Sequence, residues 1–348
     1  MYQKMTVSNV TNPQTPLIEA VRLYLASQAD HLLQQIDQID SSDWKISSDA
    51  VHKTRTALRR CLSVLTAVRP WIDKEWSRSR EKPIKRLLRA LGPVRDLDIV
   101  LQHTQSAFNP ASQEMIDVID LIRMKRVKAC QLFCRMMTRT DTKKQLLQDL
   151  SRLNQLETLL SMQPAPISEA GQVRLFTLGD CLPAMLFSSS ATVTAYHQVI
   201  SRSDIRQDQG DEHSMDALYH RLRVSLKDLR NLLLFASPVI PEKSLPFFNQ
   251  IKSLQNDLGY WHDALIVHQY LGGSFSDKQK EVIHPLQMST AARLDHLKAS
   301  FSAHWESMTA EWFLLEISVY LTNVYRESVK TGCACSGCGG QPEKNDQA

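Results

Sequence analysis

The stretch VHKTRTALRR, residues 51–60, places its basic side chains at helical spacing. At about 100° per residue, His52, Arg55 and Arg59 fall within roughly 60° of one helix face. Leu58 and Cys61 lie on a neighbouring apolar stripe, which we expect to be buried. The pattern predicts a helix whose basic face borders its buried face instead of lying opposite to it.

A second copy of this pattern lies 168 residues further along, where residues 220–230 read HRLRVSLKDLR. Two later blocks keep the same order at nearly the same offset: Leu91-Gly92-x-x-Arg95-Asp96 matches Leu258-Gly259-x-x-His262-Asp263, and Arg123 with Lys128 matches Arg293 with Lys298. Chance similarity between helices would not preserve this order and spacing. We therefore interpret the chain as a tandem duplication of a helical unit of roughly 150 residues.

Helical periodicity continues through most of the sequence, for example at Leu17, Val21 and Leu25 and again from Leu146 to Leu156. Alternating strand patterns are almost absent, so we predict an all-α fold. We expect a polar segment at 1–15, one domain at 16–328 with halves at about 16–162 and 168–328, and a flexible Cys/Gly tail at 329–348.

Capping and breaking residues predict where the helices begin and end. Ser47 or Ser48 and Ser214 are candidate N-caps. Breaks are expected at Pro70, Gly92-Pro93, Pro164-Ala165-Pro166, Pro238 with Pro241, Gly259 and Gly272-Gly273.

The charge of the chain is concentrated in one region. Its net charge is only +4, but residues 51–95 hold thirteen Lys or Arg against three Asp or Glu, which leaves −6 for the rest. Such a segment creates a positive field whatever the net charge of the chain. No stretch is apolar enough for a membrane span, and residues 1–14 lack the order of a secretory signal, so we expect a cytoplasmic location.

Basic helix faces are often only solvated surfaces, and that interpretation holds for many single helices. Here the face is repeated in register, and few acids sit three or four positions away to neutralise it. An external anion would relieve the repulsion among these cations. Arginine binds phosphate oxygens through two parallel hydrogen bonds, and lysine acts as a mobile point charge, so the residues suit a phosphate polymer.

These blocks resemble the CHAD family, the conserved histidine α-helical domain. The resemblance covers residues from about 16 to 327 and rests on Val51–Arg60, Leu91–Asp98, His220–Arg230 and Leu258–Asp263. It implies two helical bundles related by pseudo-twofold symmetry, with a basic groove between them. It also implies binding of inorganic polyphosphate and, for some members, association with polyphosphate granules. We expect this binding to be non-enzymatic.

The resemblance also implies which residues line the groove. By matching position they are His52, Arg55, Arg59, Arg60, Lys85, Arg89, Arg95, Arg123, Arg126, His220, Arg223, Lys227, Arg230, Lys252, His262, Arg293 and Lys298. Three positions depart from a fully basic repeat: Leu62 stands opposite Arg230, Asp228 opposite Arg60 and Asn256 opposite Arg89. The second half could therefore hold its share of the ligand more weakly.

Asp96 and Asp263 are unexpected in a phosphate groove. We interpret them as acids that orient neighbouring Arg or His side chains, with metal ligation as the alternative. No cofactor is expected.

Three other functions fit the sequence less well. A phosphohydrolase would need converging metal-binding carboxylates or a Glu-x-Glu-x-Lys strand, and neither is evident. Metal chelation by His52, His220 and His262 is opposed by the surrounding positive charge. Nucleic acid is not expected as the specific ligand, because aromatic stacking residues are not interleaved with the cations.

Seven cysteines are present, an odd number that suggests no disulfide framework. Four fall in helical patterns, where we expect reduced core residues: Cys61, Cys130, Cys134 and Cys181. The other three are candidate ligands of a soft metal ion, although the tail shows no fourth ligand: Cys333, Cys335 and Cys338. A flexible tail with incidental cysteines is the alternative.

Overall fold

The computed structural model describes residues 11–37, 46–107, 113–139, 144, 176–203, 212–239, 245–273, 275–308, 316 and 319. Its helices are α1 (Leu17–Asp37), α2 (Ser48–Val68), η1 (Arg69–Trp71), α3 (Lys74–Ala90), α4 (Gly92–Ala107), α5 (Gln113–Arg139), α7 (Leu178–Ser203), α8 (Glu212–Ala236), α9 (Leu245–Leu271) and α10 (Asp277–Ser307). Within the described ranges no β-strand forms, and an isolated bridge joins Pro16 to Thr177. The predicted all-α class is confirmed.

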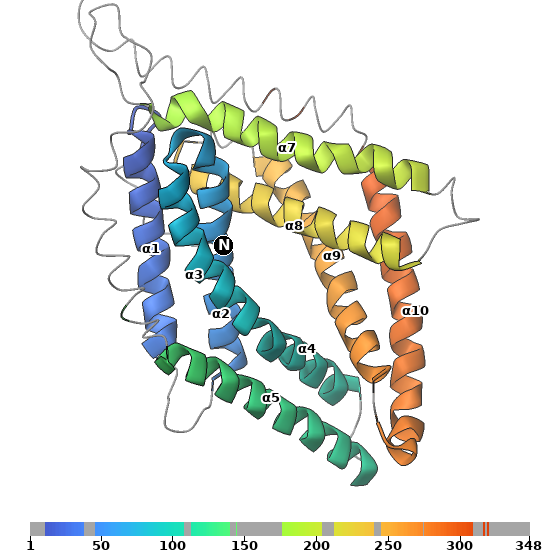
Figure 1. Cartoon of the computed structure of the whole chain (residues 1–348). Coiled ribbons are helices and arrows are strands. Elements are labelled where there is room, and N and C mark those ends of the chain that lie inside the picture. Colours follow the sequence, from blue (N-terminus) through green and yellow to red (C-terminus); the bar gives the residue numbers. More distant parts are fainter. Residues whose placement is uncertain are drawn as a thin grey trace, which may run out of the picture.

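The helices form two sets that follow the order of the chain (Figure 1). In the first set α1, α2, α3, α4 and α5 each pack against the next, and in the second set α7, α8, α9 and α10 do the same. Across the sets, α1 contacts α7, α2 contacts α8, α4 contacts α9 and α5 contacts α10. Because the repeat offset relates α2 to α8 and α4 to part of α9, elements at matching positions meet. A twofold relation would produce this pattern, and the duplication itself stays a prediction.

Two groups of buried side chains hold the sets together. The larger includes Leu58 and Leu65 of α2 with Leu222 and Leu226 of α8, all of them at most 1% exposed. The smaller joins α4, α5, α9 and α10 through residues that include Val100, Ile122, Val267 and Ile283. Burial of this apolar surface is what fixes how the helices are rotated about their axes.

Several predicted boundaries are confirmed. Ser47 caps α2 by accepting a hydrogen bond from Ala50 N over 3.0 Å, and α2 ends just before Pro70. α8 ends before Pro238, and α9 ends before Gly272. These ends follow the rule that proline and glycine stop helices.

Two predicted boundaries are wrong. Ser214 lies inside α8, which begins at Glu212, so it is no N-cap. Gly259 lies inside α9, which runs unbroken past it, whereas a new helix does begin at Gly92. The difference is that Pro93 removes a backbone donor after Gly92, while Gly259 is followed by Tyr260 and by Trp261, which is 3% exposed and packs into the core.

In the described ranges, no helix is both long enough and apolar enough to cross a membrane. The four helical cysteines are buried and free, as expected. Other predictions fall outside the described residues: the helix from Leu146 to Leu156, the junction near Pro164–Pro166, the break at Pro241, and the tail at 329–348 with Cys333, Cys335 and Cys338.

Candidate functional site

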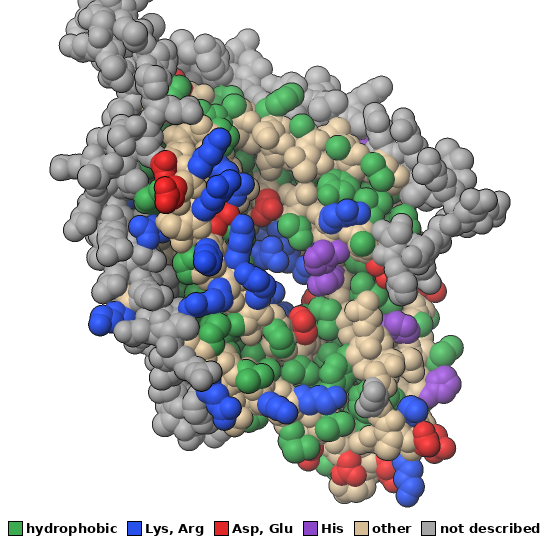
Figure 2. Space-filling model, viewed as in Figure 1, with side chains coloured by type: hydrophobic (Ala, Val, Ile, Leu, Met, Phe, Trp, Pro, Cys, Tyr) green, Lys and Arg blue, Asp and Glu red, His purple; other side chains and the backbone are tan. Residues whose placement is uncertain are grey.

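The basic faces of α2 and α8 meet because the two helices pack against each other. Electrostatic interactions reach across this contact from Arg55 and Arg59 to Arg223. Figure 2 shows Lys and Arg side chains gathered around a hollow at the centre of the molecule, with histidines at its edge. We call the residues that interact here the basic cluster: His52, Arg55, Arg59, Arg95, His220, Arg223, Lys227 and His262.

The buried leucines explain why these cations face the hollow. Leu222 and Leu226 are fully buried, and Arg223 and Lys227 follow them by one position on α8. One position is about 100° of rotation, which leaves both cations half-buried at the border of the core. The predicted arrangement of a basic face beside a buried stripe is confirmed for α2 and α8.

Arg55 is fixed by the junction between α3 and α4. Its Nη1 donates a hydrogen bond to the Leu88 carbonyl oxygen over 2.7 Å. The backbone of Gly92 passes so close that a Cβ there would lie 3.8 Å from the same nitrogen. Arg55 therefore ties α2 to this junction while the rest of its guanidinium remains near the cluster.

Asp96 and Asp263 lie among these arginines. The opposing charge that acts most strongly on the pKa of Asp96 is Arg55, and the acid that acts most strongly on the pKa of Arg223 is Asp263. Loss of surrounding water raises the pKa of Asp96, and Asp263 raises it further, so the two carboxylates are close enough to repel each other. The placement of each acid beside an arginine fits the orienting role, which stays a prediction.

The cations of the basic cluster also repel one another. Burial lowers the pKa of Lys227 to about 7, and the charges of Arg223 and Arg59 add to this effect. Burial, again with cationic neighbours, lowers the pKa of Arg223 to about 10. The cluster therefore holds more positive charge than its own acids neutralise.

Two histidines lie together at the α8–α9 contact. The rings of His220 and His262 have centroids 5.1 Å apart and planes inclined by 45°. Burial and the charge of Arg223 lower the pKa of His262 to about 3, and the same two causes lower the pKa of His220. Both rings are therefore neutral near pH 7 in the unliganded protein, and they offer one N–H donor each.

Behind the cluster, a polar contact joins α2 to α8. The buried Ser63 hydroxyl lies 2.7 Å from Asp228 Oδ1, to which it donates, and it accepts a hydrogen bond from Asn231 Nδ2 over 3.0 Å. Burial raises the pKa of Asp228, while Ser63, Arg59 and Lys227 act against that rise. The acid that interrupts the basic repeat thus has a structural contact.

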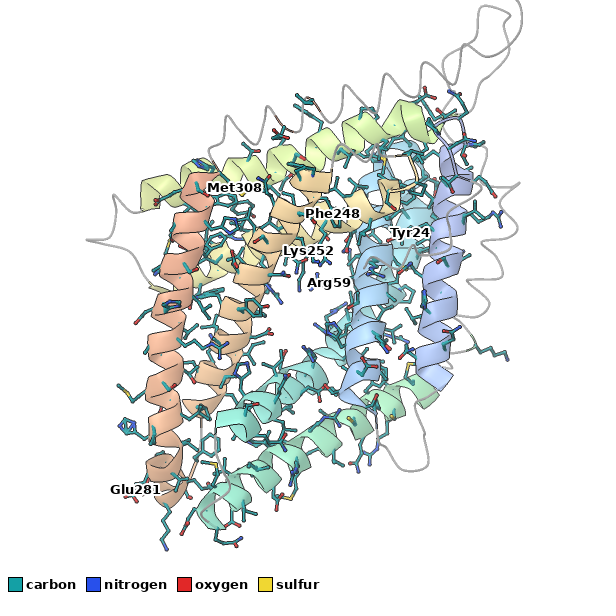
Figure 3. The ribbon with its side chains drawn as sticks, turned by 180° about the vertical axis from the view of Figure 1, so that it is seen from behind. Tyr24, Arg59, Phe248, Lys252, Glu281 and Met308 are labelled. Carbon is teal, nitrogen blue, oxygen red and sulfur yellow. The ribbon has the colours of Figure 1, made fainter. Side chains whose placement is uncertain are left out.

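Lys252 and Arg293 extend the site beyond the basic cluster. Figure 3 shows Lys252 of α9 and Arg59 of α2 at the edge of the same central space. Arg293 is exposed on α10 and interacts with His103 of α4, whose pKa is lowered by burial and by that arginine. Sequence reasoning missed His103, because the repeat places Tyr270 opposite it and no motif marks it.

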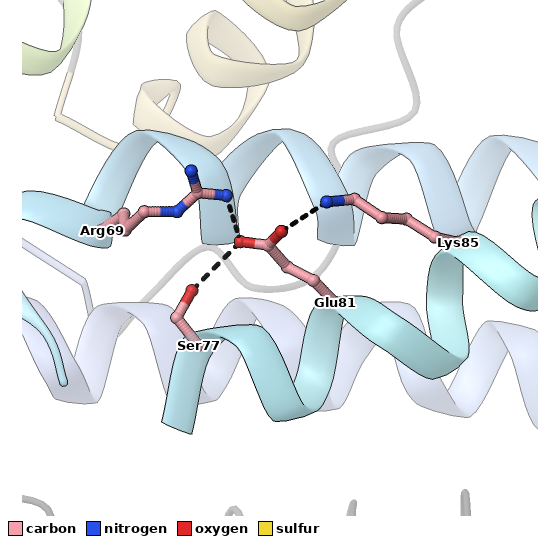
Figure 4. A network of polar contacts seen from close by, with 4 residues as sticks. All are labelled: Arg69, Ser77, Glu81 and Lys85. Atoms are coloured by element: carbon pink, nitrogen blue, oxygen red, sulfur yellow. Dashed lines mark hydrogen bonds and ion pairs between the residues drawn. The ribbon is translucent and has the colours of Figure 1, made fainter. Parts of the chain in front are cut away.

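Two other predicted residues, Lys85 and Arg230, have protein partners. Lys85 and Arg69 both pair with Glu81, at 2.7 and 2.5 Å, and Ser77 donates to the same carboxylate (Figure 4). Arg230 Nη1 donates to Gln255 Oε1 over 2.5 Å. Lys85 remains exposed despite its ion pair, with 48% of its side-chain surface accessible to solvent.

Four other predicted residues are not among those that interact in the basic cluster. The Arg60 charge acts on Tyr24 of α1, and Arg123 forms an exposed ion pair with Asp120 on α5. Arg126 donates to Asp98 over 2.5 Å and to the Ile46 carbonyl oxygen over 2.7 Å, so its guanidinium group already has two acceptors within the protein. The fourth is Lys298, which is exposed on α10.

Metal ligation by these residues has little support in the described ranges. No group of three or more His, Cys, Asp or Glu side chains there is arranged to hold a metal ion. Asp96 and Asp263 are instead surrounded by arginines, whose charge would repel a cation.

Comparisons with known proteins agree with this fold. A family model described as the CHAD domain matches residues 23–272. Among solved structures, the CHAD domain from the plant Ricinus communis is similar, at a TM-score of 0.57 and 15% identity over 92% of this chain and 94% of that one. PptA from Streptomyces chartreusis is also similar, at a TM-score of 0.60 and 13% identity over 84% of this chain and 100% of that one. No curated protein matches the chain.

Proposed function

Because the chain belongs to the CHAD domain family, we propose that its basic cluster binds inorganic polyphosphate and does not hydrolyse it. One observation carries the proposal: two helices at matching positions, α2 and α8, bring their basic faces together around one hollow. A single basic helix would be an ordinary solvated surface. Two that converge, with partly buried side chains, form a site for an anion.

The free cluster is electrostatically strained, and a polyanion would relieve that strain. The pKa of Lys227 is about 7 because burial and neighbouring cations disfavour its charge. Phosphate oxygens beside it would restore the charged form. Binding should therefore be strongest for ligands that carry many negative charges along a short length.

The cluster also holds polar nitrogens that lack a hydrogen-bond partner in the described part of the chain. Arg223 Nε and His262 Nδ1 are both buried there without such a partner. Buried polar atoms in native proteins are usually paired, so the Arg223 N–H, and the His262 N–H in the tautomer that carries its proton on Nδ1, are suited to an external acceptor. Each charge-assisted hydrogen bond to phosphate contributes about 1.5–3 kcal/mol.

Hydrolysis fits these residues less well than binding does. Enzymes that cleave phosphoanhydride bonds commonly use metal ions that are held by several carboxylates. In the described ranges the carboxylates that act on the cluster are Asp96, Asp263, Asp49 and Asp228. Asp96 and Asp263 lie beside arginines, Asp228 bonds to Ser63, and Asp49 pairs with Lys53 over 2.6 Å.

A cytoplasmic location, with recruitment to polyphosphate granules where cells make them, is part of the same proposal. A fluorescent fusion should lose its punctate distribution in cells that cannot make polyphosphate. An unchanged distribution would contradict recruitment by this ligand.

Binding of purified chain to polyphosphate, RNA and DNA at about 50 and about 200 mM salt tests the proposal. We expect a clear preference for polyphosphate and a steep loss of affinity with salt. The variant Arg59→Gln with Lys227→Gln should bind at least about tenfold more weakly, given the strength of charge-assisted bonds. Equal affinity for RNA would contradict the polyphosphate assignment, and release of phosphate in the presence of Mg²⁺ would contradict the absence of hydrolysis.

A further inference from the structure

The exposed face of α3 carries a line of cations that the basic cluster does not include. Lys74, Arg78, Lys82, Lys85 and Arg89 are all exposed, and at about 100° per residue they fall within roughly 80° of arc. We call these five residues the α3 stripe. From Lys74 to Arg89 the stripe is about 22 Å long at 1.5 Å per residue.

The α3 stripe leads directly into the basic cluster. Its last residue, Arg89, follows Leu88, whose carbonyl oxygen accepts the hydrogen bond from Arg55 Nη1. Arg95, in the first turn of α4, then interacts with both Arg55 and His52. Figure 2 shows Lys and Arg side chains continuing from the central hollow over the same face of the molecule.

Internal acids neutralise only part of the stripe. Glu81 pairs with Lys85, but it is 4% exposed and shares its charge with Arg69 (Figure 4). The described residues give no ion-pair partner to Lys74, Arg78 or Lys82. Repulsion among such cations is unfavourable in the unliganded protein, as it is in the cluster.

The matching positions in the second half of the sequence do not repeat this stripe. At the repeat offset of 167, the positions opposite the five cations are Pro241, Leu245, Asn249, Lys252 and Asn256. Only Lys252 keeps a charge. The positive surface therefore leaves the central cluster along α3 and has no equivalent along the first turns of α9.

From this asymmetry we infer that a long polyphosphate chain runs out of the basic cluster along the α3 stripe, so that the protein distinguishes long chains from short ones. This rests on the proposed function. A short ligand such as tripolyphosphate fills only the cluster. A long chain also contacts Lys74, Arg78 and Lys82, and it releases further counterions as it does so.

The test compares long-chain polyphosphate with tripolyphosphate on the full chain. The variant Lys74→Gln, Arg78→Gln, Lys82→Gln should lose at least about tenfold in affinity for the long chain, and its salt dependence should become shallower by about 2 in log–log slope. Its affinity for tripolyphosphate should change less than about twofold. All three residues are exposed, so the variant should unfold at the temperature of the unmodified chain.

A matched control removes the same charge elsewhere. Lys128→Gln, Arg135→Gln, Lys278→Gln takes two lysines and one arginine from exposed positions on α5 and α10. An effect of net charge alone would weaken long-chain binding equally in both triple variants, and that result would overturn the inference. Equal losses for long and short ligands in the α3 variant would overturn it too. If the unmodified chain binds neither ligand, the proposed function itself fails.

Discussion

Asn231 Nδ2 donates a hydrogen bond to Ser63 Oγ over 3.0 Å, and the two residues are 168 positions apart. The same offset relates His52 to His220 on these two helices. Residues at matching positions can touch only near an axis that relates the two halves. The crossing of α2 and α8 is therefore where a twofold axis would pass, and the basic cluster lies beside that crossing.

Asp228, which bonds to Ser63 at this crossing, should oppose polyphosphate binding. Burial raises the pKa of Asp228, and its carboxylate attracts the charges of Arg59 and Lys227. Asp228→Asn keeps an oxygen that can accept from Ser63 and removes the negative charge. We expect affinity for polyphosphate to rise severalfold. The free energy of unfolding should change by less than about 1 kcal/mol, because the charge lost is a buried one that is costly to desolvate, and this offsets the loss of its attraction to Arg59 and Lys227. Isothermal titration calorimetry and chemical denaturation measure the two effects.

The control for this variant is Asp277→Asn, an exposed acid at the start of α10. It should leave affinity unchanged. Weaker binding by Asp228→Asn would show that the acid positions Arg59, and that its charge does not merely oppose the ligand.

The paired basic faces could be predicted from the sequence because helix periodicity is a local property. A leucine at a buried position fixes the rotation of the helix, and the cations one position further on must then lie at the border of the core. Leu226 and Lys227 show this relation on α8. The repeat indicated that two such faces exist, and the contact between α2 and α8 brought them together.

Partners that are distant in the sequence could not be predicted in this way. Nothing near Asp228 in the sequence indicates that Ser63, 165 residues away, donates to it. Arg126 looks like any cation on a basic helix until α5 is packed against α4, where Asp98 occupies its guanidinium. Side chains of this kind take their roles from tertiary packing, which charge and periodicity do not specify.

Polyphosphate affinity should fall as the pH rises above about 7. Burial and the charges of Arg223, Arg59 and Arg55 lower the pKa of Lys227 to about 7, and Asp263 acts against them. A bound phosphate chain would raise that pKa again, so binding above pH 7 takes up a proton. Calorimetry in buffers of different ionisation enthalpy measures this uptake. Lys227→Arg, which stays charged, should bind with little dependence on pH between 7 and 9.

The same lowered pKa affects the stability of the unliganded protein in the opposite direction. Between pH 7 and the ordinary lysine value of 10.5, the unfolded chain binds more protons at this position than the folded chain does. The contribution of Lys227 to the free energy of unfolding therefore increases with pH over this range. If Lys227→Met shows the same pH dependence of denaturation as the unmodified chain, this assignment is wrong.

Gly259 weakens α9, and its replacement should stabilise the protein. It lies inside the helix, and a Cβ at this position would meet nothing within 4 Å. Gly259→Ala should raise the free energy of unfolding by about 0.5–1 kcal/mol, because glycine loses more backbone entropy in a helix than alanine does. Gly273→Ala is the comparison, since a Cβ there would lie 3.0 Å from the Tyr270 carbonyl oxygen. A loss of stability in Gly259→Ala would show that the position needs glycine for a reason other than space.

Substitution of Arg126 distinguishes a structural role from a role in polyphosphate binding. Its guanidinium donates to Asp98, which is 5% exposed, and to the Ile46 carbonyl oxygen ahead of α2. Arg126→Met would leave the Asp98 carboxylate buried without its cation, which typically costs about 3–5 kcal/mol of stability. Below its melting temperature, however, the variant should bind polyphosphate with nearly unchanged affinity, because the guanidinium of Arg126 already donates to Asp98 and to the Ile46 carbonyl oxygen. The double variant Arg126→Met with Asp98→Leu removes both charges and should recover much of the lost stability. If affinity falls along with stability and the double variant does not restore it, Arg126 contacts the ligand after all, as the family resemblance implied.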